Sequence, residues 1–321
     1  MRPTRFTVTL AAMLSGLLIL GLGAQAQSFP TGPIRLVVNF NPGGTTDLAA
    51  RIIADMAEER FGVPVVVENR SGAGGSLGVG SVSRSNRDGY TVGTITASPV
   101  TTLPYTQDMG FHPIDDLTYL VQFATTYHPI AVRADAPWDT YQEFIEHARQ
   151  NPGAIRYATA GTLNQPHLAM EQVAMAEDVT MIFVPFAEGG AAAMVALLGG
   201  HIDATIVSDF FGPLEAGQIK LLAETGDVSI SGREDVPTFP ELGYDFFGVA
   251  LVGLIAPSGL PDDVAAILEE VFTDVVNDPE FQRRLADIGV QATFKNAADF
   301  TDFARTAYEN TGTVLQALEA Q

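Results

Sequence analysis

The stretch "VVNFNPGGTTDLAARIIADM", Val37 to Met56, places an apolar run directly before two glycines and the start of an amphipathic helix. An apolar run that ends at Gly43 and Gly44 and continues into a helix is typical of a strand–turn–helix unit. The first turn of such a helix leaves backbone N–H groups without partners, and the helix dipole favours negative charge there. The stretch therefore predicts an α/β fold with an anion-binding loop after its first strand.

The first residues of the chain have the pattern of an export signal. Arg2 and Arg5 precede an uncharged, mostly apolar run over residues 6–23, and Ala24-Gln25-Ala26 follows with the small-x-small pattern of a cleavage site. A membrane anchor is the alternative, because the run approaches the length that spans a bilayer. We expect a signal peptide over residues 1–26 that is cleaved after Ala26.

The rest of the chain is strongly acidic. Without the two signal arginines its 17 basic residues fall to 15, against 38 acidic ones, and the net charge moves from −21 to near −23. This charge argues against nucleic acid and anionic membranes as partners. The chain has no cysteine, and its five histidines lack the spacing of metal ligands. No phosphate-loop or dinucleotide motif is present, so we expect no metal and no cofactor.

Strand and helix patterns alternate along the chain in two series. We expect strands at 34–40, 63–69 and 90–97 in the first series and at 154–161, 179–186 and 201–210 in the second, with helices at 166–176 and 189–200. This order predicts mainly parallel sheets with helices on both faces. Both series open with Ile-Arg and reach a second glycine loop, at 72–75 and at 189–190, which indicates two lobes of like design.

Two long apolar runs, 121–138 and 246–261, are suited to cross between these lobes. The crossings divide the chain into a discontinuous first lobe, 27–126 with 249–321, and a second lobe, 127–248. Thr140 and Glu143 form a capping box for a helix over 140–153. Further helices are expected at 262–277, 279–288 and 297–319.

In open α/β sheets a ligand binds beyond the carboxyl ends of the strands. Loops 41–47, 70–76, 160–165 and 186–190 occupy such positions, two in each lobe, and predict a ligand cleft between the lobes. Each loop alone also fits an ordinary strand-to-helix turn. Asp47 either caps its helix or contacts the ligand, and the hydroxyls of Thr45 and Thr46 either cap the helix or donate to a carboxylate.

Residues 74–78 match the G-x-S-x-G pattern of a serine nucleophile. That pattern requires a strand that runs straight into its first glycine, whereas this strand is expected to end near Asn69. A secreted hydrolase that uses Ser76 therefore stays an alternative, and we expect no enzyme.

Motifs along the whole mature chain, in this order, resemble the substrate-binding proteins of tripartite tricarboxylate transporters, the Bug family. They are "PIRLVVNFNPGGTTDLAAR" (33–51), "GVPVVVENRSGAGGSLG" (62–78), "RDGYTVG" (87–93), "NPGAIRYATAG" (151–161), "HLAMEQ" (167–172), "VPF" (184–186), "LLGGHIDA" (197–204) and "GLIAPSGLP" (253–261).

The resemblance implies a periplasmic, type II clamshell that captures a small organic acid for the large and small permease subunits of a transporter, with a monomer expected. It implies that main-chain groups of the first lobe hold a carboxylate and that the second lobe and nearby strand ends set specificity. Carried onto this chain, the ligand-binding residues are Phe40, Asn41, Gly43, Gly44, Thr45, Thr46, Asp47, Gly72, Ala73, Gly74, Gly75, Thr96, Ser98, Gly161, Thr162, Asn164, Phe186 and Asp209.

The chain departs from the family pattern after "VPF". Ala187-Glu188 stands where the family often has a basic residue, and Asn39 and Asn41 replace the commoner proline and small residue. An acidic Glu188 disfavours a second or third carboxylate or attracts an amino group. We expect a mono- or dicarboxylate rather than citrate. A sensory accessory protein for a membrane receptor would carry the same residues and stays open.

Overall fold

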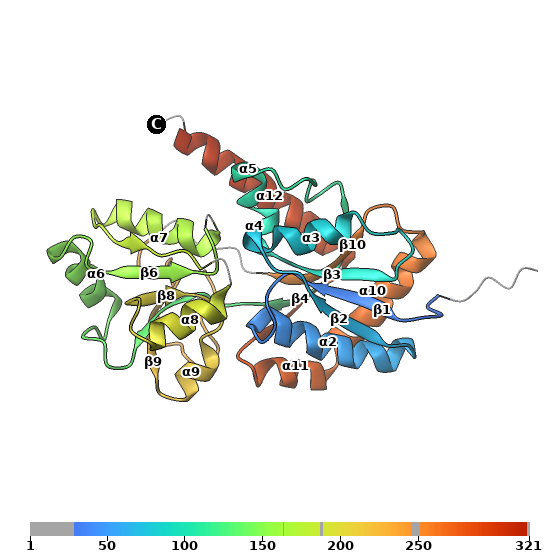
Figure 1. Ribbon diagram of the computed structural model, residues 1–321, viewed down its shortest axis with the longest axis horizontal. Helices are drawn as coiled ribbons and strands as arrows, with labels where there is room; N and C mark the ends of the chain where they lie inside the picture. Colours follow the sequence, from blue (N-terminus) through green and yellow to red (C-terminus); the bar gives the residue numbers. More distant parts are fainter. Residues whose placement is uncertain (1–28, 163, 187–188, 245–250, 320–321) are drawn as a thin grey trace, which may run out of the picture.

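The computed structural model describes residues 29–162, 164–186, 189–244 and 251–319 and arranges them in two lobes, each built on one sheet (Figure 1). The expected signal peptide, Ala187-Glu188 and the lobe boundary at 249 lie outside the described residues. The first sheet has the strand order β11-β4-β10-β3-β1-β2 and the second the order β7-β6-β8-β5-β9. Helices cover both faces of each sheet, as expected for a type II clamshell.

The strands are β1 (Ile34–Val38), β2 (Val65–Asn69), β3 (Thr91–Thr96), β4 (Leu117–Thr125), β5 (Pro129–Arg133), β6 (Arg156–Thr159), β7 (Ile182–Phe183), β8 (Ala204–Ile206), β9 (Ile219–Glu224), β10 (Val252–Pro257) and β11 (Gln291–Lys295). The helices are α2 (Thr45–Phe61), η1 (Ala73–Gly75), α3 (Ser76–Ser83), α4 (Ala97–Val100), α5 (Leu103–Thr106), α6 (Tyr141–Gln150), α7 (Gln165–Ala176), α8 (Gly190–Leu198), α9 (Phe211–Glu215), α10 (Asp262–Val276), α11 (Pro279–Ala286) and α12 (Ala297–Glu319).

The two series of elements have the same topology, so the predicted likeness of the lobes is confirmed. In the first sheet β1 lies between β2 and β3 and is parallel to both. In the second sheet β6 lies between β7 and β8 and is parallel to both. The carboxyl ends of the central strands therefore carry equivalent loops in the two lobes.

The expected parallel strands are present, and each sheet is mixed because it also contains antiparallel strands. β10 is antiparallel to both β3 and β4, and β5 is antiparallel to both β8 and β9. The first apolar run contributes residues to β4 and β5, and the described part of the second run contains β10. Since β4 runs towards the second lobe and β10 returns from it, the two run in opposite directions.

Each lobe has an apolar core on both faces of its sheet. In the first lobe Leu36 faces a cluster with Ile53 of α2 and Leu268 of α10, whereas Val37 faces a cluster with Val79 of α3 and Phe300 of α12. Alternate residues of β1 thus enter opposite cores, which is why this strand reads as a continuous apolar run. Within the described ranges, no helix has both the length and the apolar character to cross a bilayer.

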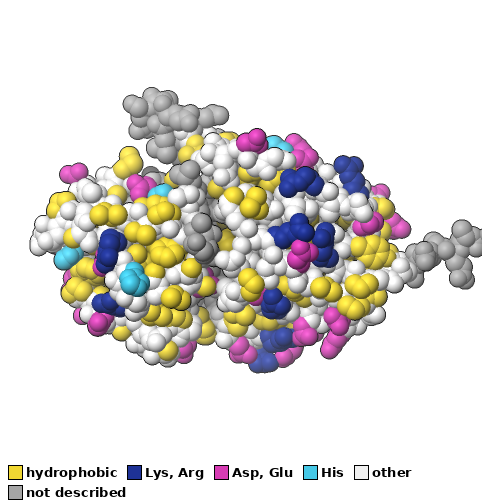
Figure 2. All heavy atoms as spheres, viewed as in Figure 1, with side chains coloured by type: hydrophobic (Ala, Val, Ile, Leu, Met, Phe, Trp, Pro, Cys, Tyr) yellow, Lys and Arg dark blue, Asp and Glu magenta, His cyan; other side chains and the backbone are white. Residues whose placement is uncertain are grey.

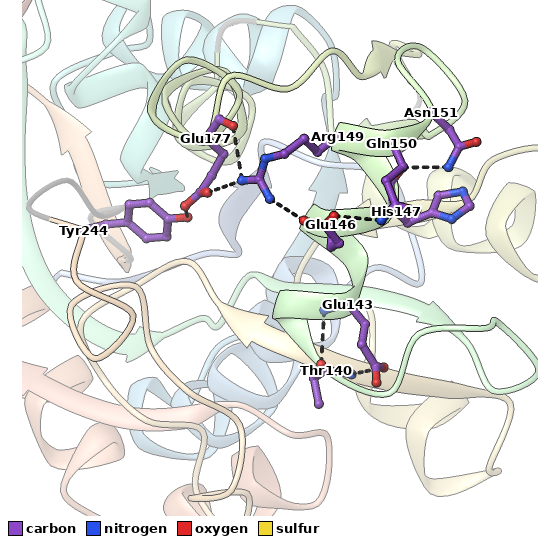
Figure 3. Close-up of polar contacts among 9 residues, drawn as sticks. All are labelled: Thr140, Glu143, Glu146, His147, Arg149, Gln150, Asn151, Glu177 and Tyr244. Atoms are coloured by element: carbon purple, nitrogen blue, oxygen red, sulfur yellow. Dashed lines mark hydrogen bonds and ion pairs between the residues drawn. The ribbon is translucent and has the colours of Figure 1, made fainter.

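The predicted capping box at the start of α6 is confirmed (Figure 3). Thr140 Oγ1 accepts a hydrogen bond from Glu143 N, and Glu143 Oε2 accepts one from Thr140 N. At the other end of α6, Arg149 pairs with Glu177 after α7, which also accepts a 2.6 Å hydrogen bond from Tyr244 Oη. This chain of contacts joins α6, the end of α7 and the segment that contains Tyr244.

The strands expected at 179–186 and 201–210 are much shorter in the structure. β7 covers only Ile182–Phe183 at the sheet edge, and β8 ends at Ile206. Because β8 stops there, Val207 to Asp209 leave the sheet and turn towards the first lobe. These residues thereby reach the space between the lobes.

Candidate functional site

A cavity of about 90 Å³ lies between the two lobes at the carboxyl ends of β1, β3, β6 and β8. Both lobes and the crossing segment contribute to its wall. The lining residues are Phe40, Asn41, Gly44, Thr45, Thr46, Gly74, Thr96, Ala97, Ser98, Thr126, His128, Ala160, Asn164, Gln165, Pro166, Gly189, Gly190, Ala191, Ile206, Val207, Ser208, Asp209 and Leu251.

The loop between β1 and α2 is held in place by a buried carboxylate. Asp47 in the first turn of α2 is 1% exposed, and its oxygens accept hydrogen bonds from Gly43 N, Arg51 Nε and Asn69 Nδ2 at 2.8, 2.9 and 2.7 Å. Burial raises the pKa of Asp47, but these three hydrogen bonds together hold the pKa below its usual value. Asn69 also donates to the carbonyl of Phe40. Asp47 thus positions the loop and does not line the cavity.

The second glycine loop has a left-handed backbone. Residues 72 to 75 all have positive φ, and Gly75, with φ of 95°, approaches Asn39 so closely that a Cβ there would lie 2.5 Å from Asn39 Nδ2. Asn39 is fully buried and is itself fixed to Thr94 by a 2.7 Å hydrogen bond. Glycine is required here because any larger residue would collide with that side chain. The turn brings Gly74 to the cavity wall.

Helices α2, α7 and α8 begin at the cavity wall. α2 starts after Gly44, α7 after Asn164 and α8 after Gly189, and all three of these residues line the cavity. Asn164 caps α7 by accepting a 2.9 Å hydrogen bond from His167 N, and it also accepts one from Thr159 Oγ1. The N-terminal ends of helices from both lobes therefore converge on one space, which favours an anion.

The lobes touch one another around the cavity. Thr45 N donates to Asp209 Oδ1 at 2.9 Å, and Thr45 Oγ1 donates to the carbonyl of Ser208 at 2.9 Å. A Cβ on Gly161 would lie 3.9 Å from the Cα of Gly74 in the other lobe. The structure is thus a closed form, in which these contacts leave only a small internal space.

Charged side chains contribute little positive potential to this space. Among the residues described, the lining includes neither lysine nor arginine. Burial raises the pKa of Asp209, and hydrogen bonds from Thr45 offset only part of that effect. Burial lowers the pKa of His128 to about 4, so its ring is neutral near pH 7. The positive ends of peptide dipoles are therefore the main attraction for an anion here.

The structure brings part of the expected site to the cavity wall. Phe40, Asn41, Gly44, Thr45, Thr46, Gly74, Thr96, Ser98, Asn164 and Asp209 line the cavity. Gly43, Asp47, Gly72, Ala73, Gly75, Gly161, Thr162 and Phe186 are outside the lining, in or beside the same loops. Phe186 instead packs against the core of the second lobe.

Sequence reasoning missed several lining residues. Thr126 and His128 belong to the crossing segment between β4 and β5, and Ser208 follows the unexpectedly short β8. The glycine pair 189–190 indicated that loop 186–190 lies at the site, but only Phe186 of this loop was among the expected ligand-binding residues. Glu188, which was expected near the cleft mouth, lies outside the described residues.

Ser76 has no base beside it in the described part of the chain. Its hydroxyl donates to the carbonyl of Ala73 at 2.9 Å and accepts from Gln107 Nε2 at 3.3 Å. Neither partner takes up a proton from a serine nucleophile. The described residues also contain no cluster of three or more His, Asp or Glu side chains suited to a metal ion.

Comparisons with known proteins agree with this geometry. A family model described as the tripartite tricarboxylate transporter family receptor matches residues 49–320. A Cupriavidus necator protein, the UPF0065 protein in the gbd 5' region, is 33% identical to this chain, and the match covers 98% of this chain and 96% of that protein.

Two solved structures are similar over most of the chain. The periplasmic binding protein BugD has 28% identity and a TM-score of 0.82, with 90% of this chain and 98% of BugD covered. R. palustris Rpa4515, solved with adipate, has 28% identity and a TM-score of 0.83, with 90% of this chain and 97% of that chain covered. Family model, relatives and fold agree, and the chain belongs to the tripartite tricarboxylate transporter receptor family.

Proposed function

We propose that this protein captures a small mono- or dicarboxylate in the cleft between its lobes and delivers it to a tripartite transporter. The observation that carries the proposal is the convergence of the N-terminal ends of α2, α7 and α8 on a cavity whose described lining has no lysine or arginine. Such a space attracts a carboxylate through main-chain N–H groups. The adipate in R. palustris Rpa4515 supports this class of ligand.

The interactions available in the cavity are strong enough to bind a carboxylate although the protein is acidic. On the face shown in Figure 2, acidic and basic side chains are interspersed. A charge at a helix N-terminus gains roughly 0.3–2 kcal/mol, and each hydrogen bond to a charged group contributes about 1.5–3 kcal/mol. Three or four such bonds approach the roughly 8 kcal/mol of a micromolar complex before binding costs. Surface charges beyond about 8 Å are largely screened at physiological salt.

The proposed binding residues are the ones that the sequence suggested. In the first lobe, Gly44, Thr45, Thr46 and the Gly72–Gly75 turn would hold the carboxylate, with Gly43 and Asp47 supporting their loop. Specificity would come from residues that line the rest of the cavity and from residues in the loops beside it. The lining residues are Phe40, Asn41, Thr96, Ser98, Asn164 and Asp209, and those beside the cavity are Gly161, Thr162 and Phe186.

The proposal includes a location, partners and domain limits. The receptor would act in the periplasm after cleavage behind Ala26, as a monomer, and would dock on the large and small permease subunits. The lobes would comprise 27–126 with 249–321 and 127–248. The crossing at Thr126 to His128, between a strand of each sheet, supports the first of these limits.

Isothermal titration calorimetry of the mature protein against a series of C3–C10 organic acids, adipate included, tests the function. The matched control is the neutral amide of each acid that binds, since it keeps the carbon skeleton and loses the charge. We expect at least one acid to bind and its amide to fail. A series in which no acid binds, or in which amides bind equally well, would contradict the proposal.

Two further observations separate the alternatives. A serine-reactive fluorophosphonate should leave Ser76 unlabelled, and labelling at that residue would support a hydrolase instead. Permease-subunit genes beside this gene would support transport, whereas a histidine kinase gene in that place would support a sensory accessory role.

A further inference from the structure

Asp209 makes a polar contact between the lobes, at the N-terminus of α2. Its Oδ1 accepts hydrogen bonds from Thr45 N at 2.9 Å and from Thr45 Oγ1 at 3.2 Å. Thr45 is the first residue of a 17-residue helix in the other lobe. A side-chain carboxylate of the second lobe therefore occupies a main-chain donor that the proposed ligand would use.

The same carboxylate also lies against the start of α8. A Cβ on Gly190, the first residue of α8, would lie 2.1 Å from Asp209 Oδ2, and a Cβ on Gly44 would lie 3.2 Å from Oδ1. Only glycine leaves room for the carboxylate at Gly190. Asp209 is thus enclosed between the N-terminal ends of one helix from each lobe, the kind of place that binds a free anion.

Asp209 differs in its partners from Asp47 and Asp203, two other carboxylates of the chain that are fully or partly buried. Asp47 is paired with Arg51, and Asp203, on the same segment as Asp209, is paired with Arg156. The hydrogen bonds recorded for Asp209 in the described part of the structure come from Thr45 alone. Burial raises the pKa of Asp209, as expected for a carboxylate held by dipoles without a cation.

We propose that Asp209 is an internal occupant of the ligand's place: its carboxylate holds the lobes together in the empty protein, and a ligand carboxylate must take over the N-terminus of α2 from it. This inference rests on the proposed function. Binding is then an exchange of one carboxylate for another. The apparent affinity for the ligand is then the intrinsic affinity multiplied by the fraction of protein in which Asp209 has left the site.

The exchange also makes Asp209 a determinant of specificity. Once displaced from Thr45, its carboxylate stays on the cavity wall, beside the ligand. A second ligand carboxylate placed near it would be repelled, because like charges in a buried site interact strongly. Asp209 should therefore favour acids with one carboxylate in the cleft, or with two that lie far apart.

The variants Asp209→Ala and Asp209→Asn test the exchange, with Asp203→Ala as the matched control. Asp203 lies just before β8, pairs with Arg156 and does not line the cavity. Titration uses adipate and the acid that binds wild type most tightly. We expect affinity to rise about tenfold or more in Asp209→Ala, which corresponds to an occupied fraction near nine-tenths in wild type. Asp209→Asn should rise less, and the control should match wild type.

A second measurement needs no ligand. Because the chain has no cysteine, spin labels on Glu59→Cys in α2 and Val195→Cys in α8, both exposed, report the distance between the lobes. We expect a short distance in empty wild type and a longer distance, with a broader distribution, in Asp209→Ala.

The outcomes are distinct. Unchanged or weaker affinity in Asp209→Ala, while wild type binds, overturns the exchange and leaves the proposed function intact. Unchanged distances in the empty variant overturn the role of Asp209 in holding the lobes. If neither protein binds any acid, the proposed function fails, and longer distances in Asp209→Ala would then support the lobe contact alone.

Discussion

Replacing Asp47 by alanine should destabilise the fold and weaken ligand binding together. The substitution leaves Gly43 N–H and the Asn69 amide without their buried acceptor. Hydrogen bonds to a charged group contribute about 1.5–3 kcal/mol each, so loss of two at the lower end costs about 3 kcal/mol. The bond to the half-exposed Arg51 adds only about 0.3–0.5 kcal/mol. A domain with about 5–15 kcal/mol of stability remains folded.

Urea unfolding and calorimetry of Asp47→Ala and Asp55→Ala make the comparison. Asp55 lies on the same helix and also pairs with an arginine, Arg284, but its side chain is 68% exposed, so its loss should cost at most about 1 kcal/mol. Because the pKa of Asp47 is lowered in the fold, its contribution should be complete above about pH 4 and disappear as the pH falls through the folded pKa. Equal losses for the two variants would refute the reasoning.

Three other substitutions have defined outcomes. Gly74→Val places a β-branched residue at φ of 63°, with its Cβ 3.0 Å from Leu103. The variant should remain folded by circular dichroism but lose acid binding in calorimetry. The control Gly62→Val, at φ of 68° in open space, should keep its acid binding. Burial raises the pKa of Glu224 to about 8, so the folded wild type binds a proton that the unfolded chain lacks and loses stability as the pH rises from about 5 to 8.5. In Glu224→Gln the free energy of unfolding, measured with urea, should therefore depend less on pH over this range. Parallel pH profiles for the two proteins would contradict this. Asn164→Ala should lower the free energy of unfolding by about 1 kcal/mol through loss of the α7 cap. Asn164→Ser should restore the wild-type stability in thermal unfolding, because serine also caps a helix. An equal loss of stability in both variants would argue against capping.

Most of the longer helices and the central strands could be predicted from sequence because local pattern determines them, whereas α3, α4, α5 and α9 were not expected. The stripe of α2, the capping box of α6 and the glycine turns are all written in adjacent residues. The strand directions at the lobe crossings could not be predicted, since an apolar run shows no direction relative to a partner far away in the chain. β11 was missed because its pairing with β4 rather than its own short pattern defines it.

The site was predictable as four loops and not as a set of contacts. Glycine pairs mark where a backbone is exposed, and that signal located the loops of Gly44 and Gly74. Asp209 and Thr45 lie 164 positions apart in the chain. Their approach depends on the early end of β8 and on how the two lobes meet. No local pattern contains that information. The crossing residue His128 lines the cavity for the same reason.

A crystal structure of the mature protein with its tightest-binding acid tests the central claim most directly. We predict that the oxygens of one ligand carboxylate lie within hydrogen-bond distance of main-chain N–H groups at the start of α2 and in the Gly72–Gly75 turn, with Asp209 moved away from Thr45. An acid held mainly by arginine or lysine side chains, or bound outside the cleft, would contradict the account.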